Sequence, residues 1–197
     1  MIELLPETLV IPGDCPSKAN LALDWKLKNV PSHKIKNPGL RGKKRRYEEI
    51  CQYQDFLRLT CRSFKNKHLI PDIPAGNMVF ISMIIFFEYK KIAQKKHSDL
   101  GPQDFSRDMD NAEKLIYDTL ATSGLYADDK MIVQKVVTKQ VTATKPRIEI
   151  VSLCHTRSFS DFIKWQPHQF NRTLDRLLVK LDALTGGGFL VPIRAGD

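Results

Sequence analysis

The chain has 197 residues, of which 42% are hydrophobic and 27% are charged. This composition excludes disorder throughout and suits one folded domain with an extension. Thirty-one Lys and Arg against 22 Asp and Glu give a net charge of +9. Such an excess favours a polyanionic partner, nucleic acid or an anionic membrane surface, although charge that only aids solubility gives the same total.

The first residues carry acids and prolines in place of the basic and apolar regions of a signal peptide. The longest apolar run, Met78–Phe87, is too short to span a bilayer and favours a buried strand. The four cysteines are scattered without a CxxC pair, so a zinc site or disulfide framework is weakly supported. We therefore expect no membrane partner and a cytoplasmic location, in a bacterial cell or, for a phage protein, its host.

The N-terminal part predicts a short strand over Glu7–Ile11 and a turn after Pro12. A basic insertion follows over residues 25–46, and its seven cations between residues 34 and 46 account for most of the net charge, since 9 − 7 leaves only +2. We favour a phosphate-contacting arm over a solvated, disordered linker.

Helical spacing begins at Tyr47 and continues to Lys67, and the apolar run Met78–Phe87 predicts the next strand. The polar residues 89–104 fit either a loop or a short surface helix. A second helix is predicted over Asp110–Ser123, because apolar residues recur on one face and Gly124 is well placed to end it.

The last strands are expected at Met131–Val141 and Arg147–Leu153, paired as a β-hairpin with a longer loop. A C-terminal helix is expected within residues 158–184, most clearly over 170–184. The β-α-β-α-β-β order predicts an α+β fold, a mixed sheet with helices packed on it plus a C-terminal helical extension. We assign residues 1–155 to the main domain and 156–197 to the extension.

Carboxylates gather around the second predicted helix. Asp108 and Asp110 stand at its start, Lys114 follows one turn later, and Asp128 and Asp129 precede the next strand. If that strand ran back beside the helix, Asp129 would lie near Asp108 and Asp110. Like charges this close destabilise a fold unless a hard cation such as Mg²⁺ lies between them. A bound Mg²⁺ can activate water toward a phosphodiester, and Lys114 can stabilise the developing charge.

The D-x-D pair alone is weak support for a metal site. It also occurs in nucleotide-sugar transferases and in ordinary helix caps. An EF-hand is disfavoured, because no glycine and no glutamate follow at the required positions.

The longer pattern is more specific. DMDNAEKLIYDTL at residues 108–120, GLYADD at 124–129, VQKVVTKQV at 133–141 and RIEI at 147–150 together resemble the RusA family of Holliday junction resolvases. The resemblance is strong over Asp108–Leu153 and faint over Thr8–Asn20 and the helix and strand between. It does not cover residues 25–46 or those after Leu153.

The resemblance implies a dimeric, sheet-based endonuclease that cuts four-way DNA junctions with Mg²⁺, for which Mn²⁺ can substitute. It places the family's essential carboxylates on Asp108, Asp110 and Asp129, and its lysine on Lys114. Two departures leave junction selectivity open: only Arg107 remains of the arginines that often precede the first aspartate, and the chain is longer than a minimal member.

We therefore expect a structure-selective, Mg²⁺-dependent endonuclease that acts as a homodimer on branched DNA in recombination and repair. The alternatives are a non-catalytic nucleic-acid-binding protein and, less favoured, a metal-dependent glycosyl or nucleotidyl transferase. The residues expected to contact DNA are Lys43, Lys44, Arg45, Arg46, Arg107, Lys135 and Lys139.

Overall fold

A computed structural model describes residues 2–16, 29–88, 109–142 and 145–161, together with residues 163, 175 and 179. Its strands are β1 (Ile2–Glu3), β2 (Leu9–Pro12), β3 (Met78–Glu88), β4 (Ile132–Thr142) and β5 (Arg147–Thr156). Its helices are α2 (Pro38–Lys67) and α4 (Met109–Thr122), with short 3₁₀ turns η1 (Ser32–Lys34) and η3 (Asp129–Met131). The α+β class predicted from the sequence is confirmed.

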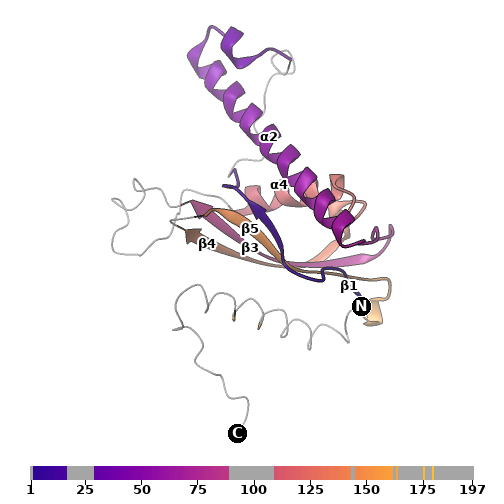
Figure 1. Ribbon diagram of the computed structural model, residues 1–197. Helices are drawn as coiled ribbons and strands as arrows, with labels where there is room; N and C mark the ends of the chain where they lie inside the picture. Colours follow the sequence, from indigo (N-terminus) through magenta and orange to yellow (C-terminus); the bar gives the residue numbers. More distant parts are fainter. Residues whose placement is uncertain are drawn as a thin grey trace.

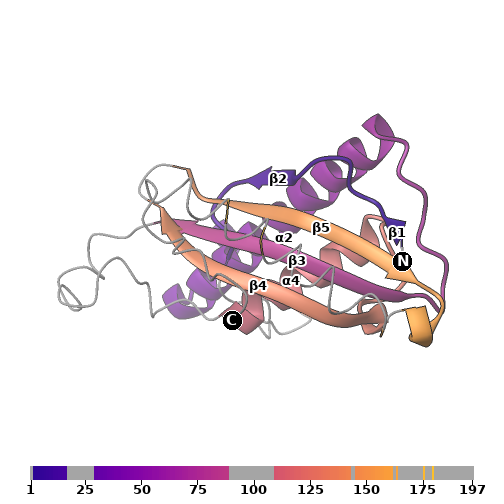
Figure 2. The ribbon, with the colours of Figure 1, turned by 90° about the horizontal axis from the view of Figure 1, so that it is seen from below.

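Strand β3 occupies the centre of the sheet (Figure 2), with β4 parallel to it on one side and β5 antiparallel on the other. Strands β1 and β2 both pair antiparallel with the outer edge of β5. The predicted hairpin between the last two strands is therefore wrong, because β3 separates them. The physical reason is the burial of β3 from Val79 to Phe87, which favours partners on both of its edges.

Helices α2 and α4 lie on the same face of the sheet (Figure 1). Helix α4 buries Ala112, Leu115, Ile116 and Leu120, which belong to the same core cluster as the strand residues Ile81 and Met83. It ends at Thr122, one residue before the predicted end, and Gly124 lies beyond it with a φ of +83°, a conformation that glycine adopts without strain.

Helix α2 starts nine residues earlier than predicted. Pro38 occupies its first turn, and the Asn37 side chain accepts hydrogen bonds from the backbone N–H groups of Gly39 (2.9 Å) and Leu40 (3.2 Å). This Asn-Pro cap begins the helix within the basic segment, ahead of the residues whose spacing predicted it. The 30 residues of α2 span about 45 Å, and the end that begins at Pro38 extends beyond the sheet (Figure 1).

Some predicted elements lie outside the described residues: the segment 89–104, and most of the C-terminal extension. Of the helix expected over 170–184, only Asp175 and Val179 are described, and both are helical. Among the residues that the structure describes, no helix combines the length and the hydrophobicity needed to cross a bilayer.

Candidate active site and DNA-contacting surface

The start of α4 carries the first part of the predicted site. Asp110 and Lys114 are both exposed, one helical turn apart on the same side of α4. Asp108 and Arg107 lie outside the described residues. The helix therefore presents one of the predicted carboxylates together with the predicted lysine toward solvent.

The second part lies between α4 and β4. Asp128 caps η3, because its carboxylate accepts a hydrogen bond from the backbone N–H of Lys130 (3.0 Å). The Lys130 ammonium is 3.8 Å from the other oxygen of the same carboxylate. These contacts give Asp128 a structural role and leave Asp129, which is partly exposed, as the better candidate for a ligand.

The acidic neighbours of Asp129 change its pKa. A hydrogen bond with Asp128 raises the pKa of Asp129, with further contributions from desolvation and from the negative charges of Asp118 and Asp128. The hydrogen bond from the Lys130 backbone is the main cause that lowers the pKa of Asp128. This end of α4 thus concentrates negative charge, which a cation would relieve.

The two parts of the predicted site are separated along α4. Glu113 of α4 forms an ion pair with Lys135 of β4, whereas Asp118, further along α4, interacts with Asp129, which precedes β4. Helix α4 therefore runs antiparallel to β4. Asp110 precedes Asp118 by eight residues, or about 12 Å along the helix axis.

The antiparallel course of α4 thus puts Asp129 nearer to Asp118 than to the start of α4, in contrast to the juxtaposition with Asp110 expected from the sequence. A strand that runs back beside a helix places its far end, and not its beginning, near the start of that helix. Within the described ranges no group of three or more His, Cys, Asp or Glu could hold a metal ion. The assignment of Asp108, Asp110 and Asp129 as metal ligands stays a prediction.

A buried polar network supports α4 on the sheet, and the sequence reasoning missed its central residue. The Glu113 side chain is only 6% exposed, pairs with the Lys135 ammonium, and accepts a hydrogen bond from the Tyr117 hydroxyl (3.3 Å). Burial, followed by the charge of Glu113, raises the pKa of Tyr117. The sequence could have indicated this network, because Glu113 lies on the apolar side of the predicted helix and a buried carboxylate requires a partner.

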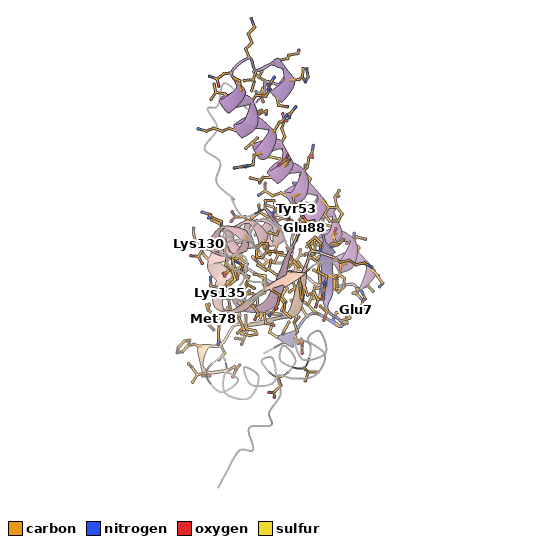
Figure 3. All side chains as sticks on the ribbon, turned by 90° about the vertical axis from the view of Figure 1, so that its left-hand side faces the viewer. Glu7, Tyr53, Met78, Glu88, Lys130 and Lys135 are labelled. Carbon is orange, nitrogen blue, oxygen red and sulfur yellow. The ribbon has the colours of Figure 1, made fainter. Side chains whose placement is uncertain are left out.

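This network bears on Lys135, which the sequence assigned to DNA contact. Figure 3 places Lys135 and Lys130 on the same side of the molecule. The Lys135 side chain is half exposed, yet its ammonium already pairs with Glu113. The Lys139 ammonium lies 5.6 Å from the centroid of the Phe87 ring.

The basic segment forms the start of α2. Lys43, Arg45 and Arg46 are exposed there. Lys44 differs, since its side chain is 5% exposed, its ammonium is 3.6 Å from the Glu48 carboxylate, and the Tyr47 ring centroid is 5.2 Å away. Three of the four cations are therefore accessible to a polyanion, on a helix within the segment that the sequence predicted to be a phosphate-contacting arm.

A mixed sheet with helices on one face, acids and a lysine along the exposed side of α4, and cations on a second helix together define the class of an α+β nucleic-acid enzyme. The model of the family described as "Endodeoxyribonuclease RusA" matches residues 31–151. This range is more than half of the chain, and the chain belongs to the RusA family. It is accordingly an endodeoxyribonuclease of the Holliday junction resolvase type. No curated protein matches it.

The matched range corrects one expectation about the basic segment. All of residues 25–46 had been expected to lie outside the family resemblance, but the match begins at residue 31 and so includes η1 and the basic start of α2. Its end at residue 151 lies close to the limit expected from the sequence.

Proposed function

We propose that this protein cleaves branched DNA such as Holliday junctions in a Mg²⁺-dependent reaction, in recombination and repair. The observation that carries the proposal is the family pattern of three aspartates and one lysine inside the matched range. The exposure of Asp110 and Lys114 on α4 supports it, because groups that act on a DNA phosphate must be accessible.

The donor chemistry fits a hard divalent cation. Asp108, Asp110 and Asp129 would supply carboxylate oxygens, the ligands that Mg²⁺ prefers, and the acidic neighbourhood that raises the pKa of Asp129 favours a cation there. When bound, Mg²⁺ supplies activation of water and charge neutralisation at the phosphate. Lys114 stabilises the negative charge that builds on the phosphate oxygens.

The separation of Asp110 and Asp129 favours a homodimer in which the site is shared. About 12 Å of helix lies between Asp110 and Asp118, the neighbour of Asp129. Mg²⁺ binds its ligands at about 2 Å, so carboxylates that share one ion must lie close together, and this arrangement does not favour Asp110 and Asp129 of one subunit as ligands of the same ion. We infer that two subunits related by a two-fold axis each bring the start of α4 to the Asp129 of the other.

We assign DNA-backbone contacts to Lys43, Arg45 and Arg46 on α2, with Arg107 and Lys139 as further contacts. Lys44 is left out because it is buried against Glu48. Lys135 contacts DNA only if its pairing with Glu113 opens. Contacts of this kind add affinity without reading sequence.

The nuclease domain in this proposal comprises residues 1–155, with residues 156–197 as an extension. We also place the protein in the cytoplasm, since Cys15, Cys51, Cys61 and Cys154 are free thiols, the usual state in a reducing compartment.

A cleavage assay tests the proposal. A synthetic four-way junction and a linear duplex of the same sequence are incubated with the protein, with Mg²⁺, with Mn²⁺ or with a chelator. We expect metal-dependent paired cuts in the junction and little cutting of the duplex. A protein that binds the junction but cuts it with neither metal would instead be a non-catalytic binding protein.

A further inference from the structure

The turn between α4 and η3 is held in place by residues far away in sequence. This turn, residues 123–128, leads directly from α4 to Asp129. Lys65 of α2 donates a hydrogen bond to the backbone carbonyl of Gly124 (2.6 Å) and pairs with the carboxylate of Asp72. Arg62, one turn earlier on α2, donates to the carbonyl of Thr122 (3.2 Å).

These two cations replace a feature that α4 lacks. The last turn of α4 contains no basic residue of its own. The carbonyl groups at the end of a helix carry partial negative charge and lack partners within the helix, and a nearby cation stabilises them. Arg62 and Lys65 provide that charge from another helix, and so fix where α4 ends relative to α2.

The Lys65 side chain is held in a defined position. It is only 16% exposed and bridges two acceptors, the Gly124 carbonyl and the Asp72 carboxylate. Two further hydrogen bonds fix the same turn: one from the backbone N–H of Ile73 to the Leu125 carbonyl (3.3 Å) and one from the Tyr126 hydroxyl to the Tyr117 carbonyl (3.0 Å). The backbone that leads into Asp128 and Asp129 is therefore held in place at several points. A displacement of Gly124 would also move these two aspartates, which follow within five residues.

We propose that Lys65 is a positioning residue, supported by Arg62, which holds the turn after α4 so that Asp129 is oriented for metal binding. This inference rests on the proposed function of Asp129. Groups that hydrogen-bond directly to metal ligands typically change metal affinity by about 10- to 100-fold when mutated, and Lys65, which acts through the turn, is expected at the lower end of this range.

The test compares Lys65→Met with Lys67→Met in the full-length protein. Lys67 is a matched control on the same helix, 69% exposed and paired with the exposed Glu7. Hydrogen exchange of the backbone amides of residues 124–131 is measured without metal or DNA, and Mn²⁺ binding is measured by electron paramagnetic resonance. We expect Lys65→Met to accelerate exchange in this turn and to weaken Mn²⁺ binding about tenfold, whereas Lys67→Met changes neither.

Two further variants separate positioning from general stability. Lys65→Arg keeps a cationic donor and should restore most of the Mn²⁺ affinity. Arg62→Met removes the second contact and should shift exchange and affinity in the same direction; it also serves as the test if Lys65→Met does not fold. Unchanged Mn²⁺ binding in folded Lys65→Met, or in Arg62→Met where Lys65→Met is unfolded, would overturn the proposal.

The failure of this inference can be told apart from a failure of the proposed function. If the unmodified protein binds no Mn²⁺ and cuts no junction, the metal-site assignment itself is wrong. If the unmodified protein binds Mn²⁺ and Lys65→Met binds it equally well, only the positioning role is wrong.

Discussion

At the scale of single residues, the acids around α4 have different surroundings. Some make structural contacts, and one is exposed on the helix. Asp128 caps η3 and Glu113 is buried against Lys135, whereas Asp110 is exposed on α4. All three are acids in one stretch of sequence, and only their surroundings distinguish them. The consequence is a specific expectation for Asp110 and for Lys114 beside it.

Asp110→Asn should reduce junction cleavage by at least about 10³-fold while junction binding stays the same or tightens slightly. The substitution keeps the shape of the side chain but removes a ligand charge, and it also removes a negative charge that faces DNA phosphates. Cleavage rates and gel-shift affinities measure the two effects. Asp55→Asn, an exposed acid on α2 that pairs with Arg58, is the control and should cut normally. Normal cutting by Asp110→Asn would show that this aspartate is not a ligand.

Lys114→Ala should slow cleavage by about 10²- to 10³-fold, the usual effect of removing one group that stabilises transition-state charge. More Mg²⁺ should not restore the rate, because the missing charge is not part of the metal's binding site. A titration of the rate against Mg²⁺ concentration distinguishes this from loss of a ligand. Full recovery at high Mg²⁺ would assign Lys114 to metal binding instead.

At the scale of elements, the long helix α2 combines two regions with different surroundings. Its part from Ile50 onward contributes Ile50, Leu57 and Cys61 to the core, and its N-terminal part extends beyond the sheet with exposed cations (Figure 1). Because Asn37 caps the helix at its start, the exposed cations and the core residues belong to one continuous helix. The cations are therefore presented on a rigid element at a fixed distance from the sheet.

Replacing Lys43, Arg45 and Arg46 together by Ala should weaken junction binding and flatten its dependence on salt. Removing one cation that neutralises a phosphate lowers the slope of log K against log salt concentration by close to one unit, so the slope should fall by about two to three units. Lys44→Ala should leave the slope unchanged and lower the melting temperature, because Lys44 is buried and paired with Glu48. Equal slopes for the triple variant and the unmodified protein would restrict α2 to a structural role.

At the scale of the whole molecule, the course of α4 bears on whether the proposed site lies within one subunit or is shared between two. Its antiparallel course along β4 puts the two groups of carboxylates toward opposite ends of the helix. In the proposed homodimer a site that uses both groups is shared between two subunits, and mixed dimers test this proposal directly.

Asp110→Asn and Asp129→Asn subunits, each inactive alone, should recover activity when they are mixed and allowed to exchange. In a shared site, each mixed dimer contains one site with both substitutions and one intact site. Random pairing makes half of the dimers mixed, so about one quarter of the normal number of sites should return, and the product should be single nicks. Sites contained within one subunit would leave every dimer inactive.

A second mixture, of doubly substituted and unmodified subunits, is the matched control. A subunit carrying both Asp110→Asn and Asp129→Asn should inactivate an unmodified partner in a shared site, because each site then contains one substituted group. In a site contained within one subunit, the unmodified partner would keep cutting. Nicking of a labelled junction distinguishes the two results.

The sequence by itself determined the features that depend on local chemistry. The apolar run of β3, the amphipathic pattern of α4 with Gly124 behind it, and the spacing of the aspartates and Lys114 each reflect residue type and separation. These features were enough for the α+β class and for the family, since a motif is itself a local pattern.

Only the tertiary structure decided which of these elements and side chains meet. The insertion of β3 between β4 and β5 satisfies both edges of a buried strand, and no pattern within β4 or β5 records it. Lys44 is buried while Lys43 and Arg45 are exposed, because the surroundings of α2 differ from one side to the next. The distance between Asp110 and Asp129 depends on the direction of a helix against a strand, and this geometry arises from packing across the whole sheet.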